Sequence, residues 1–106
     1  QIGIDRKEGF SPWILCATAG TTNLGAIDPI KECYEISRRE HLWMHVDAAY
    51  GGFFSLIADD SADGVASAPY KAIANVDSVV VDPHKHGLQP YGCQSFWLPS
   101  HSGCFG

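Results

Sequence analysis

Short, largely apolar runs separated by polar turns dominate the pattern of this chain, and they predict the strands of a sheet. Residues 13–17, 42–46 and 77–81 form three such runs, each too short for a typical helix. The first run is apolar at every position, which is typical of a strand buried on both faces of a parallel sheet. A fourth run, residues 94–98, is a candidate for one further strand.

A helix is predicted between the first two runs, over residues 29–40. Asp28 would cap its first turn, and Pro29 would occupy its first helical position. A strand, a helix and a strand in this order predict a βαβ unit with parallel strands and a right-handed crossover. Residues 66–74 are weakly helical in pattern and are interrupted by Pro69.

The composition indicates a folded protein and argues against nucleic-acid and membrane partners. The 106 residues include 12 acidic and 7 basic side chains, and 45% of them are hydrophobic, which is enough to build a core and argues against disorder. The net charge of −5 and the lack of a basic cluster predict no nucleic-acid partner. No uncharged stretch is long enough to span a bilayer, and residues 1–9 contain no signal-peptide core, so we expect a cytoplasmic protein without a membrane partner.

The four cysteines are not spaced as a zinc site or a redox pair. No C-x-x-C motif is present, so free thiols in a reducing compartment are expected, with Cys93 buried. The chain begins with Gln1 rather than methionine, and we expect it to be a piece of a longer protein.

Polar clusters follow each of the three main apolar runs, at residues 19–23, 47–52 and 82–87. Ligands of open α/β sheets bind at the carboxyl ends of the strands. If the three strands are neighbours, Thr22, Asp47 and Lys85 can therefore point into one crevice.

A lysine and an aspartate at strand ends suit one kind of chemistry in particular. A lysine amine commonly forms a Schiff base with a carbonyl, and pyridoxal phosphate supplies such a carbonyl. The pyridine nitrogen of this cofactor needs a proton to withdraw electrons, and Asp47 could hold that proton by charge pairing. The small side chains of Ala48 and Ala49 would leave room for the flat ring.

Four segments together resemble one enzyme family. They are residues 18–22 (TAGTT), 25–28 (GAID), 43–52 (WMHVDAAYGG) and 82–85 (DPHK). In this order and spacing they are similar to the group II pyridoxal-phosphate-dependent amino acid decarboxylases, which include the aromatic-amino-acid, glutamate, tyrosine and histidine decarboxylases. The resemblance extends over most of residues 13–93.

The resemblance implies an α/β fold of the aspartate-aminotransferase type (fold type I), in which residues 1–106 form part of the large, mainly parallel-sheet, cofactor-binding domain. The upstream region and the C-terminal small domain would lie outside this chain. The implied activity is decarboxylation of an L-amino acid to an amine and CO2 with pyridoxal 5'-phosphate, in a homodimer. The implied roles are an internal aldimine on Lys85, pairing of the pyridine nitrogen with Asp47, ring packing by Ala49, a hydrogen bond near Asp47 or the ring from Thr22, and positions near the phosphate for His84 and Asp82.

Three features depart from the family pattern. Many members have Asn at the position of Asp82, and a second carboxylate beside a phosphate is unfavourable without a compensating cation. His86 follows the lysine where members often have Trp or Met. Residues 94–106 fit the family pattern only loosely.

Other interpretations stay open at this point. Asp47 could cap a helix, Thr22 could serve only its turn, and His45 could be a satisfied core histidine. His84 and His86 have the spacing of a metal pair but lack a third ligand, so we predict no metal site. The chain could also come from a carbon–carbon lyase or an aminotransferase of the same fold, or be a non-catalytic fragment, and alone we expect it to be inactive.

Overall fold

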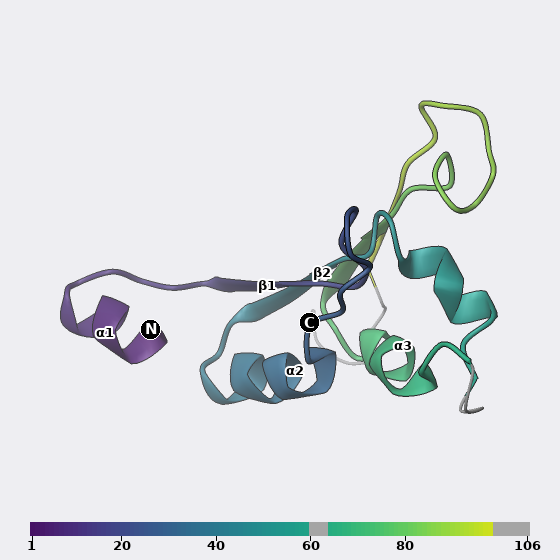
Figure 1. Ribbon diagram of the computed structural model, residues 1–106. Coiled ribbons are helices and arrows are strands. Elements are labelled where there is room, and N and C mark those ends of the chain that lie inside the picture. Colours follow the sequence, from purple (N-terminus) through teal and green to yellow (C-terminus); the bar gives the residue numbers. More distant parts are fainter. Residues whose placement is uncertain (60–63, 99–106) are drawn as a thin grey trace, which may run out of the picture.

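The computed structural model describes residues 1–59 and 64–98 (Figure 1). The elements follow the order helix, strand, helix, strand, 3-10 helix, helix, strand, strand. Their bounds are α1 Ile2–Lys7, β1 Ile14–Thr18, α2 Ile30–Arg39, β2 Trp43–Asp47, η1 Gly52–Leu56, α3 Ser67–Ile73, β3 Ser78–Val81 and β4 Ser95–Trp97. Within these residues no helix is long and apolar enough to cross a membrane.

The four strands form one sheet in the order β1-β2-β3-β4. β1 pairs with β2 and β2 with β3 in parallel, whereas β4 runs antiparallel to β3. The predicted parallel βαβ unit and the fourth strand are therefore confirmed. The register places Thr18 beside Asp47 and Asp47 beside Val80, so the polar segments after β1, β2 and β3 begin at the same edge of the sheet.

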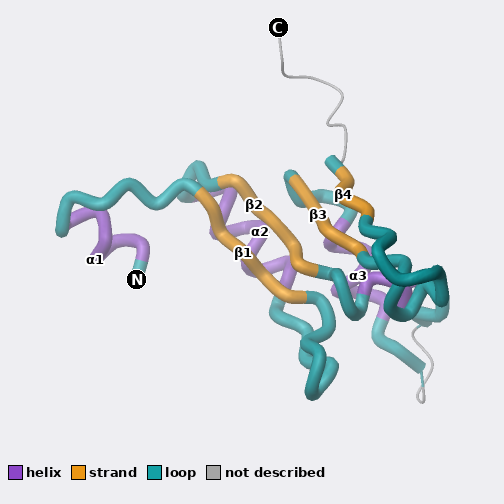
Figure 2. Tube along the Cα trace, turned by 90° about the horizontal axis from the view of Figure 1, so that it is seen from above, coloured by secondary structure: helices purple, strands orange, loops and turns teal. Residues whose placement is uncertain are grey.

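Helices α2 and α3 cover one face of the sheet (Figures 1 and 2). Met44 and Val46 point into this layer and are fully buried, together with Ile30 from α2 and Val76 from the turn before β3. Neighbouring strand residues point to opposite faces, so Trp43, His45 and Asp47 lie on the other face. Among the described residues, no helix covers that face.

The prediction that the first strand is buried on both faces was wrong. Ala17 is buried against the helices, but Ile14 is 37% exposed and Cys16 is exposed on the opposite face. A continuously apolar strand indicates that both faces are suited to burial, and only one of them is covered within the described residues.

Two details of the predicted helices differ in the structure. Asp28 does not cap α2, because its carboxylate accepts a hydrogen bond from the Thr18 backbone N–H at 2.7 Å, and the helix begins at Ile30. Pro69 does not interrupt α3, because it stands in the first turn, where a backbone N–H has no partner within the helix.

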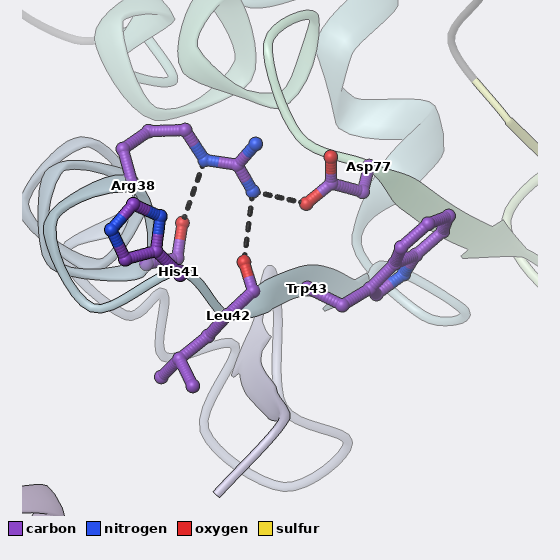
Figure 3. A pocket seen from close by; sticks show the side chains of 6 residues that line it. Arg38, His41, Leu42, Trp43 and Asp77 are labelled. Carbon is purple, nitrogen blue, oxygen red and sulfur yellow. Dashed lines mark hydrogen bonds and ion pairs between the residues drawn. The ribbon is translucent and has the colours of Figure 1, made fainter. Parts of the chain in front are cut away.

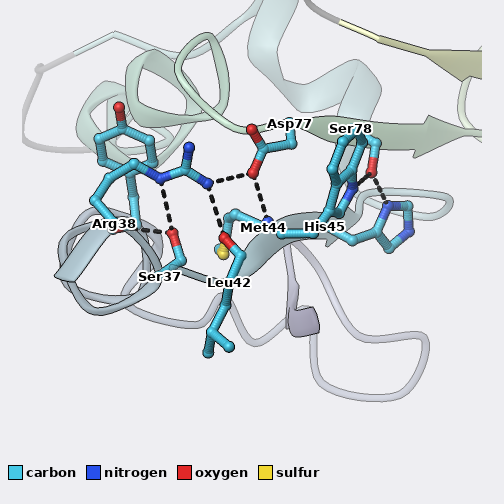
Figure 4. Close-up of polar contacts among 9 residues, drawn as sticks. Ser37, Arg38, Leu42, Met44, His45, Asp77 and Ser78 are labelled. Atoms are coloured by element: carbon cyan, nitrogen blue, oxygen red, sulfur yellow. Dashed lines mark hydrogen bonds and ion pairs between the residues drawn. The ribbon is translucent and has the colours of Figure 1, made fainter. Parts of the chain in front are cut away.

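A polar cluster ties α2 to the amino ends of β2 and β3 (Figures 3 and 4). Arg38 pairs with the carboxylate of Asp77 and donates to Leu42 O at 3.0 Å. The same carboxylate oxygen of Asp77 accepts from the Met44 backbone N–H at 2.6 Å. These groups line an open pocket at the edge of the sheet opposite the polar clusters.

A second cluster lies on the uncovered face. Ser78 Oγ accepts from Trp43 Nε1 at 2.9 Å and lies 2.8 Å from His45 Nδ1 (Figure 4). His45 also stacks on Phe96 of β4, with 6.0 Å between the ring centroids. The polar and ring contacts of His45 agree with the interpretation that it is a structural histidine with satisfied hydrogen bonds.

Candidate functional site

The loops that follow β1 and β2 touch backbone to backbone. A Cβ atom on Gly51 would lie 2.2 Å from Ala19 O, and one on Gly20 would lie 2.6 Å from the Cα of Gly51. Ala19 N–H also donates to Asp47 O at 2.8 Å. Glycine at both positions therefore allows the two loops to meet beside the carboxyl end of β2.

Asp47 is the last residue of β2, and its side chain is exposed. One carboxylate oxygen accepts from the Ala49 backbone N–H at 3.0 Å. The carboxylate caps no helix, because η1 begins after Gly51. This hydrogen bond fixes the carboxylate at the strand end while the side chain remains accessible to a ligand.

Lys85 lies in the turn that follows β3. Its Nζ lies 2.7 Å from Asp82 Oδ2 and 5.7 Å from the centroid of the Tyr50 ring. The hydrogen bond to Asp82 raises the pKa of Lys85, and the nearby charges of Asp82 and Asp47 raise it further. The structure therefore brings Lys85 into the electrostatic field of Asp47, although the two residues belong to different loops.

Asp82 is a buried carboxylate with an unusual environment. It is 3% exposed, and among the described residues its Oδ1 has no hydrogen-bond donor, whereas Oδ2 accepts from Lys85. Its backbone N–H donates to Ala49 O at 3.3 Å, which connects the end of β3 to the loop after β2. The lysine ammonium is the cation that offsets this buried charge.

His84 lies near the same Asp82 carboxylate oxygen as the Lys85 amine. Its Nδ1 lies 2.5 Å from Cys93 O, so this nitrogen carries the proton, and its Nε2 lies 4.0 Å from Asp82 Oδ2. The ring also packs on Tyr91 at 4.9 Å between centroids. His84 thus connects residues 82–87, which we call the lysine turn, to the segment before β4. The thiol of Cys93 is exposed, so the prediction that it is buried was wrong.

Thr22 is exposed in the turn that begins at Thr21, and among the described residues no hydrogen bond connects it to the other candidates. The hydroxyl that stabilises this turn belongs to Thr21, which accepts from Ala26 N–H at 3.0 Å. Of the six predicted site residues, the structure brings together Asp47, Ala49, Asp82, His84 and Lys85. Among residues 1–59 and 64–98, no group of three His, Cys, Asp or Glu side chains could hold a metal ion.

Three aromatic residues around Lys85 were not among the predicted site residues. The His86 ring meets the Tyr50 ring edge-on at 4.5 Å between centroids, and it lies 4.7 Å from the Phe54 ring. His86 Nδ1 also lies 2.7 Å from Tyr50 O. The only sequence signal was the unusual histidine after the lysine, because contact between residues 50 and 86 depends on the tertiary fold.

Comparison with known proteins relates nearly the whole chain to one family of enzymes. Residues 1–102 match the model of the pyridoxal-dependent decarboxylase conserved domain. Human cysteine sulfinic acid decarboxylase is 41% identical over 104 residues, and 4-hydroxyphenylacetaldehyde synthase from Rhodiola rosea is 39% identical over 98 residues. These alignments cover 96% and 91% of this chain.

Solved structures agree with the sequence comparison. The crystal structure of Oryza sativa TDC with PLP and tryptamine superposes with a TM-score of 0.76 at 29% identity and covers 92% of this chain and 19% of that one. The chain spans about a fifth of the length of its curated relatives, 20% and 18% for the two named above. The predicted fold class, an α/β fragment with a mainly parallel sheet, is confirmed, and the chain belongs to the pyridoxal-dependent decarboxylase family.

Proposed function

We propose that the whole protein decarboxylates an L-amino acid to an amine and CO2, with pyridoxal 5'-phosphate as its cofactor. The observation that carries the proposal is the arrangement of Asp47 and Lys85. They stand at the carboxyl ends of the neighbouring parallel strands β2 and β3, and the charge of Asp47 acts on the Lys85 amine. Membership of the decarboxylase family supports the reaction class.

The side chains present fit this cofactor in three respects. Lys85 offers a primary amine for covalent attachment of the cofactor aldehyde, and Asp47 offers an accessible carboxylate for the pyridine nitrogen. Ala49 is half-buried beside Asp47 and is small enough to lie against a flat ring. When bound, pyridoxal phosphate supplies an electron sink for the charge that remains on the α-carbon as CO2 departs.

The remaining predicted residues take different parts in the proposal. Asp82 is assigned to Lys85 rather than to the phosphate, because its buried carboxylate accepts from the lysine amine and, as an anion, has no hydrogen to donate to a phosphate. His84 is assigned to the phosphate side of the site, as the resemblance implies, and Thr22 to the ring side. The hydrogen bond from Asp82 N–H to Ala49 O supports the placement of Asp82 and His84 at the same edge of the sheet as Asp47.

We further propose that the whole protein is a cytoplasmic homodimer whose small-molecule partner is an amino acid. The acidic composition, with a net charge of −5, argues against a nucleic-acid partner, and no membrane partner is proposed. Light scattering of the full-length protein tests the dimer, and cell fractionation tests the location. A monomer, or a protein found outside the cytoplasm, would contradict these two statements.

Borohydride reduction tests the cofactor and its attachment point. The full-length protein is incubated with pyridoxal phosphate, reduced, digested and mapped by mass spectrometry. We expect a pyridoxyl group on Lys85, none on the exposed Lys31 of α2, and no label at this site in Lys85→Arg. A folded protein that carries no label on Lys85 would overturn the proposal.

Amine release tests the reaction. The full-length protein is loaded with pyridoxal phosphate and supplied with a panel of aromatic and acidic L-amino acids. Both CO2 and the amine are then measured. We expect equimolar CO2 and amine from at least one of them, and a large loss of rate in Asp47→Asn, which removes the charge that holds the ring proton. Amino-group transfer to a keto acid without CO2 would indicate an aminotransferase instead.

A further inference from the structure

His86 contacts the segment that carries Asp47 through two different groups. Its Nδ1 lies 2.7 Å from the backbone oxygen of Tyr50, and its ring meets the edge of the Tyr50 ring. Tyr50 stands three residues after Asp47, and His86 stands directly after Lys85. His86 is therefore a second point of attachment between the lysine turn and residues 47–52, the Asp47 segment, in addition to the hydrogen bond from Asp82 N–H to Ala49 O.

The hydrogen-bond partner determines which ring nitrogen of His86 carries the proton. A backbone carbonyl only accepts hydrogen bonds, so Nδ1 of His86 must be the donor to Tyr50 O. The hydrogen bond therefore depends on a side chain with an N–H donor two bonds from Cβ.

The neighbouring residues leave little room between the two segments. A Cβ atom on Gly87 would lie 2.5 Å from Cζ of Phe53 and 2.7 Å from Pro83 O. The Phe54 ring lies 4.7 Å from the His86 ring on another side. The lysine turn thus packs against η1, and the His86 hydrogen bond joins it to Tyr50, which lies just before η1.

We propose that His86 is a positioning residue. Its hydrogen bond to Tyr50 O fastens the lysine turn to the Asp47 segment, so that the Lys85 amine and the Asp47 carboxylate are presented together to one ligand. This inference rests on the proposed function for the identity of that ligand. Without the bond, only the hydrogen bond from Asp82 N–H to Ala49 O would join the two segments near the site. The lysine turn beyond Asp82 would then have to be ordered when the ligand binds, and the affinity would fall by that cost.

The test compares two substitutions with opposite properties in the full-length protein. Asn carries an amide N–H two bonds from Cβ, as His carries Nδ1, so His86→Asn retains the donor and loses the ring. His86→Phe retains a ring between Tyr50 and Phe54 and loses the donor. Phe54→Leu is the matched control, because it removes a ring contact and leaves the hydrogen bond in place.

The first readout needs no cofactor. Amide hydrogen exchange is followed in the cofactor-free protein over residues 47–52 and 82–88. We expect His86→Phe to raise exchange in both segments together, and His86→Asn and Phe54→Leu to leave both near wild type. Unchanged exchange in His86→Phe, or a rise confined to one segment, would overturn the inference whatever the protein binds.

The second readout is the dissociation constant for pyridoxal phosphate, measured by titration of its absorbance. We expect it to rise on the order of fivefold in His86→Phe, as the loss of one hydrogen bond allows, and to return to within about twofold of wild type in His86→Asn. The reverse order, with His86→Phe close to wild type and His86→Asn impaired, would overturn the inference, because the His86 ring would then act by packing and not by its hydrogen bond. A wild-type protein that binds no pyridoxal phosphate would refute the proposed function, whereas normal binding by His86→Phe would refute only the role of His86.

Discussion

Lys85 and Asp82 form an ion pair in which the aspartate side chain is 4% exposed and the lysine side chain is 33% exposed. The pair therefore stabilises the protonated amine, whereas a nucleophilic lysine must lose its proton. Because Asp82 raises the pKa of Lys85, this amine gives up its proton less readily than a lysine without that partner.

Asp82→Asn should make the Lys85 amine more reactive. The hydrogen bond and charge of Asp82 raise the pKa of Lys85, and their removal lets that pKa fall, because burial then acts in the opposite direction. We expect the rate of pyridoxal phosphate attachment, followed by absorbance as a function of pH, to reach half its maximum at a lower pH than in wild type. Glu35→Gln, an exposed charge neutralisation on α2, should leave that profile unchanged.

The same ion pair should make stability depend on pH in the alkaline range. A lysine whose pKa is raised on folding contributes stability that is complete below its unfolded pKa and is lost as pH rises through the folded pKa. We expect the urea midpoint of the cofactor-free protein to fall over that interval, and to fall less in Asp82→Asn. Parallel losses in both proteins would show that Lys85 is not the group responsible.

Gly51→Ala should push apart the loops after β1 and β2. Its methyl group would lie 2.2 Å from Ala19 O, a backbone atom that cannot swing aside. We expect a loss of about 2 kcal/mol in the free energy of unfolding and weaker binding of pyridoxal phosphate. Gly3→Ala is the control, since nothing lies within 4 Å of that site in α1, and it should change stability by less than about 1 kcal/mol. Equal effects of the two substitutions would contradict the close approach.

Asp77→Ala should cost more stability than removal of its arginine partner. Without the carboxylate, the N–H of the fully buried Met44 has no acceptor, which costs roughly 2 kcal/mol. Arg38→Met leaves that hydrogen bond intact and should cost about 1 kcal/mol, while Arg39→Met removes only an exposed charge contact and should change stability by less than about 0.5 kcal/mol. Urea denaturation checks the order, which would be contradicted if Arg38→Met were the most harmful of the three.

The strands and α2 could be predicted because each has a strong local pattern, whereas the segment that forms α3 has only a weak helical pattern with Pro69 in it. The four runs of apolar residues correspond to β1–β4 within one or two residues at each end, and the segment 29–40 contains α2. The two loops with Asp47 and Lys85 were also predictable, since parallel strands present their carboxyl ends at one edge.

Other features depend on contacts between distant residues. Helix α1 buries none of its side chains and is held by the bond from Arg6 to Glu40, 2.6 Å long, so it has no apolar periodicity to detect. Asp28 has the pattern of a helix cap, but the Thr18 N–H on the neighbouring strand takes its carboxylate. The Tyr50–His86 contact joins residues 36 positions apart and leaves no trace in either segment alone.

The strands lie in the sheet in the same order as they occur in the sequence. Within the described residues, β2, β3 and β4 each pair with the strand that precedes them in the sequence, so no pairing has to skip over another strand. A ribosome that delivers the chain from its amino end would supply β2 to a waiting β1, and then β3 to β2, before the antiparallel β4 arrives. The aspartate segment is therefore in position before the lysine turn emerges, and the site can be completed by docking one turn onto a partly formed sheet.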